Sequence, residues 1–384
     1  MKFAIDKKDL QNCIQHLVSV APSKNVSPIL TNYLIQASVD TGKVRITTSD
    51  LEITVVAEVD AAVNESGSIA VSSKHFNEII HAMPEAMINF SRHEDLLRIQ
   101  SNKINFNLLI ADHTLFPLVP EIDLTNAIKI DAKLFNRMIS KTQFAVSSDV
   151  NRKVLTGVCW KIMPDSHLMA ATDGRKVAEI KINNSALFPA DSPIFSGDMG
   201  DEGVIEKIIP VKTLAFMQKI YDTQHKEVSF LIEANKVIFS YGSYLVFSQI
   251  IEHKYPEYQK AFVVDLQNRF EVKKDALQSA IRRVALVAPG ENQRIRIEVS
   301  NEQFVVNTTS RDTGDAKENL DDYHFEGIET GVSFSFRYML SILDVVDSEK
   351  VVINLGTSRD PLMIYNQANQ ENEEITFLLM PLRS

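Results

Sequence analysis

The sequence predicts an α+β fold made of three copies of one domain, each with two amphipathic helices and several antiparallel strands. The first observation is a short alternating strand that leads into an amphipathic helix, found at 2–17, 127–144 and 269–287. The second is another helix followed by alternating strands, which occurs in every copy and in the same order. Equivalent positions 3, 128 and 270 lie 125 and 142 residues apart. Solenoid repeats are only about 20–50 residues long, so each copy is expected to be a domain.

The first helix of each copy is predicted from apolar residues at helical spacing. These residues are Leu10, Ile14 and Leu17 in the first copy, Leu134, Met138 and Ile139 in the second, and Leu277, Ile281 and Val284 in the third. The second helix of each copy starts near Lys74, Lys212 and Arg337. Turn residues such as Ser101-Asn102 and Ala234-Asn235 separate the strands that follow, as antiparallel hairpins require.

The domain boundaries are expected where proline-rich linkers interrupt these patterns. One linker lies near Pro117–Glu121, and a second runs from Tyr255 to Asn268. We therefore expect a first domain at 1–125, a second at 126–264 and a third at 265–384.

The composition is that of a globular protein from a reducing compartment. The chain has 384 residues, 45% of them hydrophobic, and only two cysteines, which excludes a disulfide framework. Charged residues stand near the N-terminus where a signal peptide would need an apolar stretch, and no run of 18 apolar residues occurs. A cytoplasmic location is expected.

Charge is segregated along the sequence. The six predicted helices at 7–17, 73–83, 133–144, 211–221, 273–284 and 336–347 carry a net charge of +8, whereas the whole chain carries −10. One explanation is that helix surfaces generally favour Lys and Arg, and the alternative is a helical face directed at a polyanion. Such a face would include Arg137, Lys141, Arg282 and Arg283.

No sequence motif indicates catalysis, a metal or a cofactor. Walker A, GxGxxG, HExxH, CxxC and GxSxG patterns do not occur. The segment Thr172-Asp173-Gly174 is typical of a tight hairpin turn. A hydrolase or phosphotransferase that uses Asp173 and the loop Gly197–Gly203 is the alternative, and a structural repeat protein without a DNA partner is a third possibility.

Six short motifs together resemble the bacterial DNA polymerase III beta subunit family, the replicative sliding clamps. They are Met1–Phe3, Pro28–Leu30, Asp50–Glu52, Ala171–Gly174, Tyr255–Tyr258 and Leu379–Arg383. The resemblance spans the whole chain. It implies DNA-clamp domains and a non-enzymatic, head-to-tail homodimer that closes a ring around duplex DNA, with helices lining the hole and antiparallel sheets outside. The ring would tether the replicative polymerase and other DNA enzymes, and so confer processivity.

The resemblance also implies where this chain would contact DNA and its own second copy. The DNA-facing residues would be Lys24, Lys74, Arg137, Lys141, Arg152, Lys153, Lys212, Arg282 and Arg283. DNA contact would be independent of base sequence. At the dimer interface, Phe106 and Leu108 would pack against Leu286 and Val287 of the second copy.

A pocket for short peptides is the third implication of the resemblance. The peptides would come from the polymerase catalytic subunit, the clamp loader and repair polymerases. The pocket would comprise Leu155, Thr172, Gly174, Arg175, Lys176, Val177, Pro256, Lys260, Met380, Pro381, Leu382 and Arg383. Relatives commonly have His-Arg-Leu where this chain has Arg175-Lys176-Val177, and a lysine cannot form the planar, two-pronged contact of an arginine.

Overall fold

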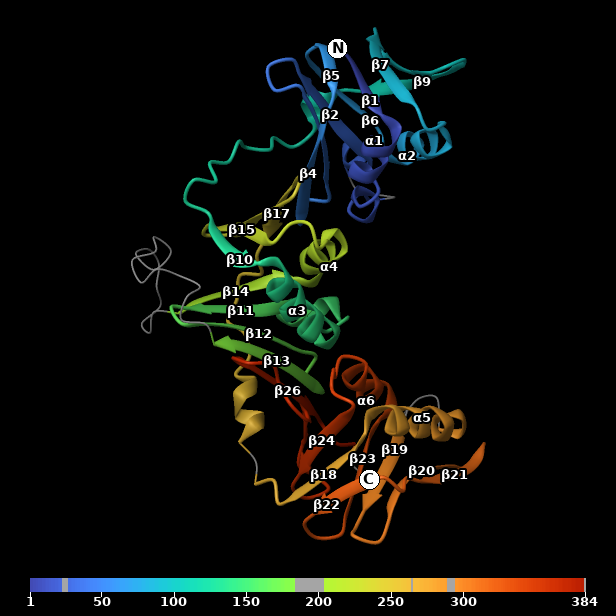
Figure 1. The fold of residues 1–384 in the computed structure, drawn as a ribbon, viewed down its shortest axis with the longest axis vertical. Coiled ribbons are helices and arrows are strands. Elements are labelled where there is room, and N and C mark those ends of the chain that lie inside the picture. The colour runs from blue at the N-terminus through green and yellow to red at the C-terminus, as the bar shows by residue number, and fades with distance from the viewer. Residues whose placement is uncertain (23–26, 184–203, 264, 289–293, 383–384) are drawn as a thin grey trace. The chain divides into compact units, whose positions relative to one another are not determined.

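The computed structural model describes the chain except for residues 23–26, 184–203, 264, 289–293 and 383–384. The chain folds into two compact units (Figure 1). Unit 1 contains Met1–Asn136 and Lys212–Ile250, and unit 2 contains Arg137–Val211 and Ile251–Ser384. The second repeat therefore contributes to both units.

Unit 1 is built on one antiparallel sheet of thirteen strands. In sheet order the strands are β10 (Ile128–Asp131), β15 (Glu227–Ile232), β16 (Lys236–Tyr241), β17 (Tyr244–Gln249), β4 (Ile53–Asp60), β3 (Lys43–Ser49), β2 (Asn32–Ser38), β6 (Gly67–Ser72), β9 (Ile104–Ala111), β8 (Leu96–Ser101), β7 (Met87–His93), β1 (Lys2–Asp6) and β5 (Ala62–Glu65). The first and second repeats join where β4 pairs with β17, with Val55 opposite Val246. This pairing leaves neither strand as an exposed sheet edge.

Helices α1 (Lys7–Ile14), α2 (Ser73–Ala82) and α4 (Val211–Ile220) bury their apolar faces in unit 1. The side chain of Asp6 accepts the backbone N–H of Lys8 and so caps α1, a common way to begin a helix. Stacked rings of Phe3 and Phe90, 4.7 Å apart, lie in the core. Helix α3 (Ala132–Thr142) begins in unit 1 and ends in unit 2.

Unit 2 contains two antiparallel sheets. The nine-stranded sheet has the order β14 (Ile205–Pro210), β11 (Gly157–Met163), β12 (Ser166–Thr172), β13 (Lys176–Asn183), β26 (Glu373–Leu379), β25 (Leu362–Asn366), β24 (Lys350–Leu355), β18 (Asn268–Lys273) and β22 (Tyr323–Glu326). The four-stranded sheet has the order β21 (Gly314–Asn319), β20 (Phe304–Ser310), β19 (Arg294–Val299) and β23 (Thr330–Ser335). Helices α5 (Lys274–Val284) and α6 (Phe336–Leu343) pack against each other.

All six helices expected from the sequence are present, and so the predicted α+β class is confirmed. Helix α1 is shorter than predicted because the chain passes into a separate 3₁₀ turn at Leu17–Ser19, although Leu17 is still buried. Helix α6 ends at Leu343, four residues before its predicted end. The apolar residues that predicted the helices, among them Leu10, Ile14 and Leu277, lie in the core.

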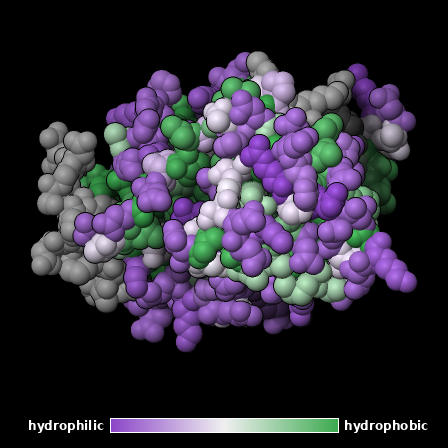
Figure 2. Space-filling view, turned by 90° about the horizontal axis from the view of Figure 1, so that it is seen from above, coloured by the Kyte–Doolittle hydropathy of each residue, from purple (hydrophilic) through white to green (hydrophobic). Residues whose placement is uncertain are grey.

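The face seen in Figure 2 is mainly hydrophilic, with apolar side chains in small separate patches. Most large apolar side chains of the sheets are buried instead. Within the described residues, no helix is both long enough and apolar enough to cross a membrane.

Candidate functional site

The turn between β12 and β13 is held by its own polar side chains. The Asp173 carboxylate accepts the backbone N–H groups of Arg175 and Lys176, at 2.8 and 3.0 Å. The Thr172 hydroxyl accepts the N–H of Gly174 and donates to the carbonyl of Lys176. Gly174 has φ of +87°, a left-handed conformation that favours glycine. The hairpin predicted here is confirmed, and Asp173 is engaged in shaping it.

An apolar cluster lies behind this turn. Leu155 and Val177, two of the predicted pocket residues, are 4% and 5% exposed and belong to one buried cluster with Tyr255, Tyr258 and Leu378. The Tyr255 hydroxyl accepts the backbone N–H of Thr172 at 3.0 Å. The structure therefore brings the turn and the segment around Tyr255 together.

The residues after Tyr255 form an exposed wall of the predicted pocket, and the buried ring of Tyr258 holds that wall in place. Pro256 and Lys260 are exposed, and Lys260 pairs with Glu257 on the surface. Tyr258 begins the 3₁₀ helix Tyr258–Phe262 and its ring is buried in the apolar cluster. These contacts place two more predicted pocket residues beside the cluster.

The C-terminal residues lie against the same turn. The N–H of Met380 donates to the carbonyl of Arg175 at 2.8 Å, and the N–H of Leu382 donates to the carbonyl of Ser333 at 2.7 Å. Met380 is 40% exposed, and Pro381 and Leu382 are half-buried. Arg383, also predicted in the pocket, lies outside the described residues.

Lys176 takes an arrangement that the sequence did not reveal. Its ammonium group lies over the rings of Phe144 and Tyr338, 5.4 and 4.8 Å from their centroids, and 3.9 Å from a carboxylate oxygen of Asp173. The side chain is buried, and burial lowers the pKa of Lys176 despite the opposing effect of Asp173. By contrast, Arg175 is exposed. Two aromatic rings stabilise this buried cation.

The predicted DNA-facing residues fall into two groups. Lys74, Arg152, Lys153, Arg282 and Arg283 are exposed, although Arg283 forms a two-pronged ion pair with Glu318. Lys212 is half-buried and pairs with Asp50. Lys24 lies outside the described residues.

Arg137 and Lys141 form the second group, because carboxylates hold them and, unlike the paired Arg282 and Arg283, their side chains are largely buried. Arg137 pairs with Glu373 and Asp347, and the 4%-exposed Lys141 pairs with Asp347 at 2.6 Å. The hydrogen bonds that Arg137 donates to Glu373 outweigh burial and raise the pKa of Arg137. Neither cation is free to meet a phosphate while these ion pairs persist.

The predicted dimer-interface residues lie on exposed apolar segments. Phe106 on β9 is 37% exposed and Leu108 is half-buried. Leu286 is 84% exposed in the 3₁₀ turn Ala285–Val287, and Val287 is half-buried. Sequence reasoning missed Leu109, which is 74% exposed, although the apolar run around it was a usable signal.

The described residues contain no group of three or more His, Cys, Asp or Glu side chains arranged to hold a metal ion. Both cysteines are buried and free, and burial raises the pKa of Cys13 to about 12, so its thiol stays protonated at neutral pH. The loop Gly197–Gly203 lies outside the described residues.

The fold is that of the DNA clamps, as solved structures show. A DNA polymerase sliding clamp from Bacillus subtilis is 28% identical, covers 100% of this chain and 99% of its own, and superposes with a TM-score of 0.89. The beta subunit of a DNA polymerase from Streptococcus pyogenes, 20% identical with full coverage of both chains, has the same fold with a TM-score of 0.91. A curated "Beta sliding clamp" from Staphylococcus epidermidis is 27% identical over the full length of both chains.

This chain belongs to the DNA polymerase III beta subunit family. The models of that family's N-terminal, central and C-terminal domains match residues 1–120, 129–257 and 260–383. The resemblance drawn from the sequence is confirmed. The family is a non-catalytic part of its polymerase, in agreement with the predicted lack of enzymatic activity.

Proposed function

We propose that two copies of this chain close head to tail into a ring around duplex DNA and tether the replicative polymerase and other DNA enzymes. The observation that carries this proposal is the match of three beta-subunit domains along the whole chain. A closed ring cannot leave DNA sideways, so its contacts with phosphates can be weak and exchanging. Tethering raises the local concentration of the bound enzyme and needs no chemistry of the clamp itself.

We also propose the domain boundaries and the cytoplasmic location that were expected from the sequence. We take domain 1 as 1–125, domain 2 as 126–264 and domain 3 as 265–384, which agrees closely with the family matches. DNA replication in a bacterial cell takes place in the cytoplasm, and the proposed function therefore includes that location.

The peptide pocket is assigned to the cluster around Leu155 and Val177. The Thr172–Lys176 turn, the exposed Pro256 and Lys260, and the tail from Met380 border that cluster. An apolar floor with exposed Met380 at its edge suits leucine and aromatic anchors of different partner peptides. Because Lys176 is held between two rings, its role is to shape the pocket wall more than to donate a hydrogen bond.

The DNA-facing surface is assigned to the exposed cations Lys74, Arg152, Lys153, Arg282 and Arg283. Contacts from such side chains to phosphates carry no sequence information and weaken steeply with salt. The proposal rests less on Arg137 and Lys141, because DNA contact would require their ion pairs with Asp347 and Glu373 to break.

The dimer is proposed to form between β9 of one copy and the Ala285–Val287 turn of the other. Phe106 and Leu286 supply exposed apolar surface on the two sides, with Leu108 and Val287 beside them. Burying both surfaces would also cover a long exposed apolar stretch on β9, which otherwise favours uncontrolled association.

Retention on circular DNA tests the ring directly. Protein loaded by a clamp loader onto nicked circular DNA should stay bound at high salt and run off once the circle is cut. Equal retention on linear and circular DNA would contradict the ring. The alternative of a hydrolase using Asp173 has no support, because that carboxylate accepts two backbone N–H groups of its own turn.

A further inference from the structure

The turn Thr172–Lys176, called the pocket turn below, carries more positive than negative charge. Arg152, Arg175 and Lys176 meet there with one carboxylate, that of Asp173. Asp173 lies 3.9 Å from the ammonium group of Lys176, so these two charges offset each other. Arg152 donates to the neutral backbone carbonyl of Asp173 at 2.8 Å, and no carboxylate among the described residues pairs with Arg175. Two unbalanced cations therefore stand at the pocket turn.

The backbone brings Arg175 to the edge of the apolar cluster that contains Leu155 and Val177. The carbonyl of Arg175 accepts the N–H of Met380 at 2.8 Å, and this bond continues the pairing between β13 and β26. Arg175 is thus extended like the strand that follows it. Alternate side chains of an extended segment share one face, so Arg175 lies on the same side as Val177, two residues later. An exposed cation therefore borders the apolar floor of the proposed pocket.

The first repeat builds the same turn without a cation. The Asp50 carboxylate accepts two backbone N–H groups of its own turn, as the corresponding carboxylate does in the second repeat. The carbonyl of Glu52 accepts the N–H of Gln249 at 2.9 Å, so Glu52 takes the place of Arg175. Because an acidic residue serves in this turn equally well, the shape of the turn does not explain Arg175.

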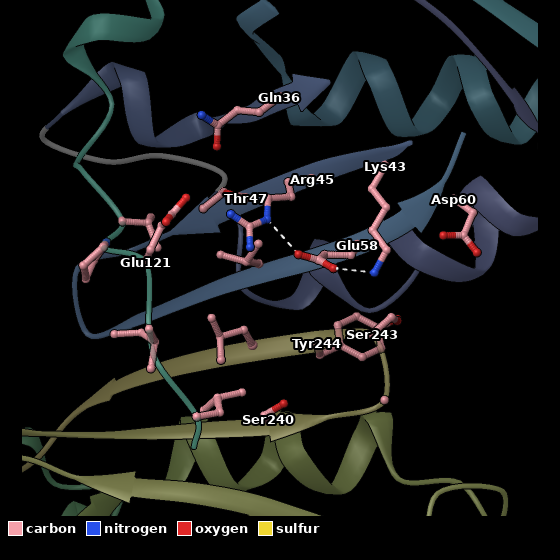
Figure 3. Close-up of a pocket in the computed structure, with 17 residues that line it drawn as sticks. Gln36, Lys43, Arg45, Thr47, Glu58, Asp60, Glu121, Ser240, Ser243 and Tyr244 are labelled. Atoms are coloured by element: carbon pink, nitrogen blue, oxygen red, sulfur yellow. Dashed lines mark hydrogen bonds and ion pairs between the residues drawn. The ribbon is translucent and has the colours of Figure 1, made fainter. Parts of the chain in front are cut away.

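Charge is arranged differently in the groove of unit 1 that Figure 3 shows. This groove has a cavity of about 580 Å³, bordered by β3, β4, β17 and the linker that follows the first repeat. Glu58 binds both Arg45 and Lys43 there, at 2.7 and 3.0 Å, and Asp60 and Glu121 border the same groove. Carboxylates thus outnumber cations. Charge complementarity favours an acidic ligand at the pocket turn and not in this groove.

We propose that Arg175 makes the pocket selective for acidic peptides, in which an aspartate or glutamate adjoins the apolar anchors. The selectivity depends on the peptide pocket of the proposed function. The peptide carboxylate pairs with the guanidinium group of Arg175, and the anchors lie on Leu155 and Val177. Arg152 covers Gly174, the residue before Arg175, and adds positive charge beside it. The histidine that relatives commonly have at this place is largely neutral at pH 7 and would not select in this way.

Methyl NMR titration of the full-length protein tests this selectivity. The probes are the blocked peptides acetyl-Ser-Asp-Leu-Phe-amide and acetyl-Ser-Asn-Leu-Phe-amide, which differ in one charge. We expect both peptides to shift the methyl signals of Leu155 and Val177, with the Asp peptide bound about ten-fold more tightly. Because the contact joins exposed charges, added KCl should reduce this ratio.

Substitutions of Arg175 separate the effect of charge from that of structure. Arg175→Gln should bind both peptides with the affinity that wild type shows for the Asn peptide. Arg175→Lys should keep part of the preference, because it keeps the charge but loses the two-pronged contact. Arg45→Gln, which removes another exposed guanidinium group from the groove of unit 1, is the control and should leave the ten-fold ratio unchanged.

The outcomes distinguish the selectivity from the pocket itself. Equal affinity of wild type for the two peptides, or an unchanged preference in Arg175→Gln, would overturn the selectivity and leave the pocket in place. Failure of both peptides to shift Leu155 and Val177 would overturn the pocket as well. Shifts from inorganic phosphate or from a short single-stranded oligonucleotide, without shifts from the Asp peptide, would assign Arg175 to a phosphate and also overturn the proposal.

Discussion

Tyr258 donates its hydroxyl hydrogen to the Glu179 carboxylate, with an O–O distance of 2.5 Å. The bond ties the 3₁₀ helix that carries Lys260 to strand β13, which carries Val177. Together with the bond between Thr172 N–H and the Tyr255 hydroxyl, it fixes both ends of the exposed wall at Pro256. The surface that we propose for peptide binding is thus held in place from beneath.

The first prediction concerns Glu179. Burial raises the pKa of this carboxyl, although Tyr258 and Lys161 act in the opposite direction. The folded protein then binds a proton more readily than the unfolded chain does, so stability falls as pH rises through the raised pKa. Glu179→Gln keeps an acceptor for Tyr258 without the charge. We expect the variant to gain stability over wild type at pH 7, and the gain to vanish below about pH 4.

Urea unfolding at several pH values measures this difference. Glu252→Gln, which changes an exposed carboxylate, is the control and should leave stability unchanged at every pH. A Gln variant less stable than wild type at pH 7 would mean that the charged hydrogen bond from Tyr258 outweighs the cost of burial.

The second prediction concerns Arg283, whose guanidinium group is paired with Glu318. Glu318 binds both Arg283 Nε and one of its terminal nitrogens, at 2.8 and 2.5 Å. Glu318→Gln would release Arg283 and remove a nearby negative charge. We expect the plot of log affinity for duplex DNA against log salt to steepen by about one unit, with no change in base preference.

Fluorescence anisotropy at a series of KCl concentrations gives this slope. Glu302→Gln removes the same charge from a turn without a bond to a helix cation, and so serves as the control. Identical slopes for the two variants would show that Arg283 does not contact DNA.

The third prediction concerns Asp347, which holds Arg137 and Lys141. Asp347→Asn would leave the buried Lys141 ammonium with the Val345 carbonyl as its remaining hydrogen-bond partner. Breaking a buried pair costs roughly 3–5 kcal/mol, but Asp347 is 47% exposed and water can replace part of the interaction. We expect a loss of about 2 kcal/mol in the free energy of unfolding at pH 7.

The pH dependence of the free energy of unfolding tests the same ion pairs of Asp347. Burial opposes ionisation of Asp347, but hydrogen bonds from Lys141 and Arg137 prevail and lower its pKa below the ordinary 3.8. The stabilisation is therefore present above that value and is lost as pH falls through the lowered pKa. Asp321→Asn, at an exposed site, should cost little at any pH. A loss of the same size for both variants would contradict the network.

Sequence patterns predicted the repeats and helices well because burial of one face of a helix imposes a regular spacing on its apolar residues. An amphipathic helix that packs on a core buries its apolar face. The spacing of Leu10, Ile14 and Leu277, which are all buried, was therefore sufficient to predict their helices. Ion pairing has no such local signature. Arg137 and Glu373 lie 236 residues apart in sequence, and no residue near Arg137 in the sequence indicates that Glu373 is its partner. An interpretation based on net helix charge therefore counted Arg137 and Lys141 as free cations.

The pocket shows the same division between local and distant information. The turn chemistry of Asp173 and Gly174 could be predicted because it depends on neighbouring residues. The position of Lys176 between Phe144 and Tyr338 could not, because those rings come from distant parts of the chain.

The fourth prediction concerns the dimer. Leu286 is 84% exposed in the single chain, so Leu286→Lys should not disturb the fold but would place an unpaired charge in the proposed interface. We expect folded monomers by light scattering, with a thermal midpoint lowered only by the loss of dimerisation. Leu108→Lys would be harder to interpret, because Leu108 is half-buried and lies opposite the buried Leu97.

The control for the dimer is Leu118→Lys, a change at an even more exposed leucine in the linker after the first repeat, which should remain dimeric. Dimeric Leu286→Lys protein at micromolar concentration would place the interface elsewhere.

The last prediction concerns the tail from Met380. The core ends at Leu379, which is fully buried, whereas Met380 is 40% exposed and Leu382 is half-buried. Deleting residues 380–384 removes two backbone hydrogen bonds, to Arg175 and Ser333, whose carbonyls can then bind water. We expect the free energy of unfolding to fall by no more than about 1 kcal/mol, and dimerisation to be unaffected.

Peptide binding should respond very differently to the same deletion. Each apolar anchor of a bound peptide gains roughly 1.5–3 kcal/mol from burial, and part of the surface that buries it would be missing. Calorimetry with a short peptide bearing leucine and phenylalanine anchors should therefore detect no binding to the truncated chain. Met380→Ala, which keeps both backbone bonds, should bind with intermediate affinity because only the side chain is lost. If the truncated chain bound the peptide as tightly as the intact protein, the tail would serve only to cover the third domain, and the pocket would have to lie elsewhere.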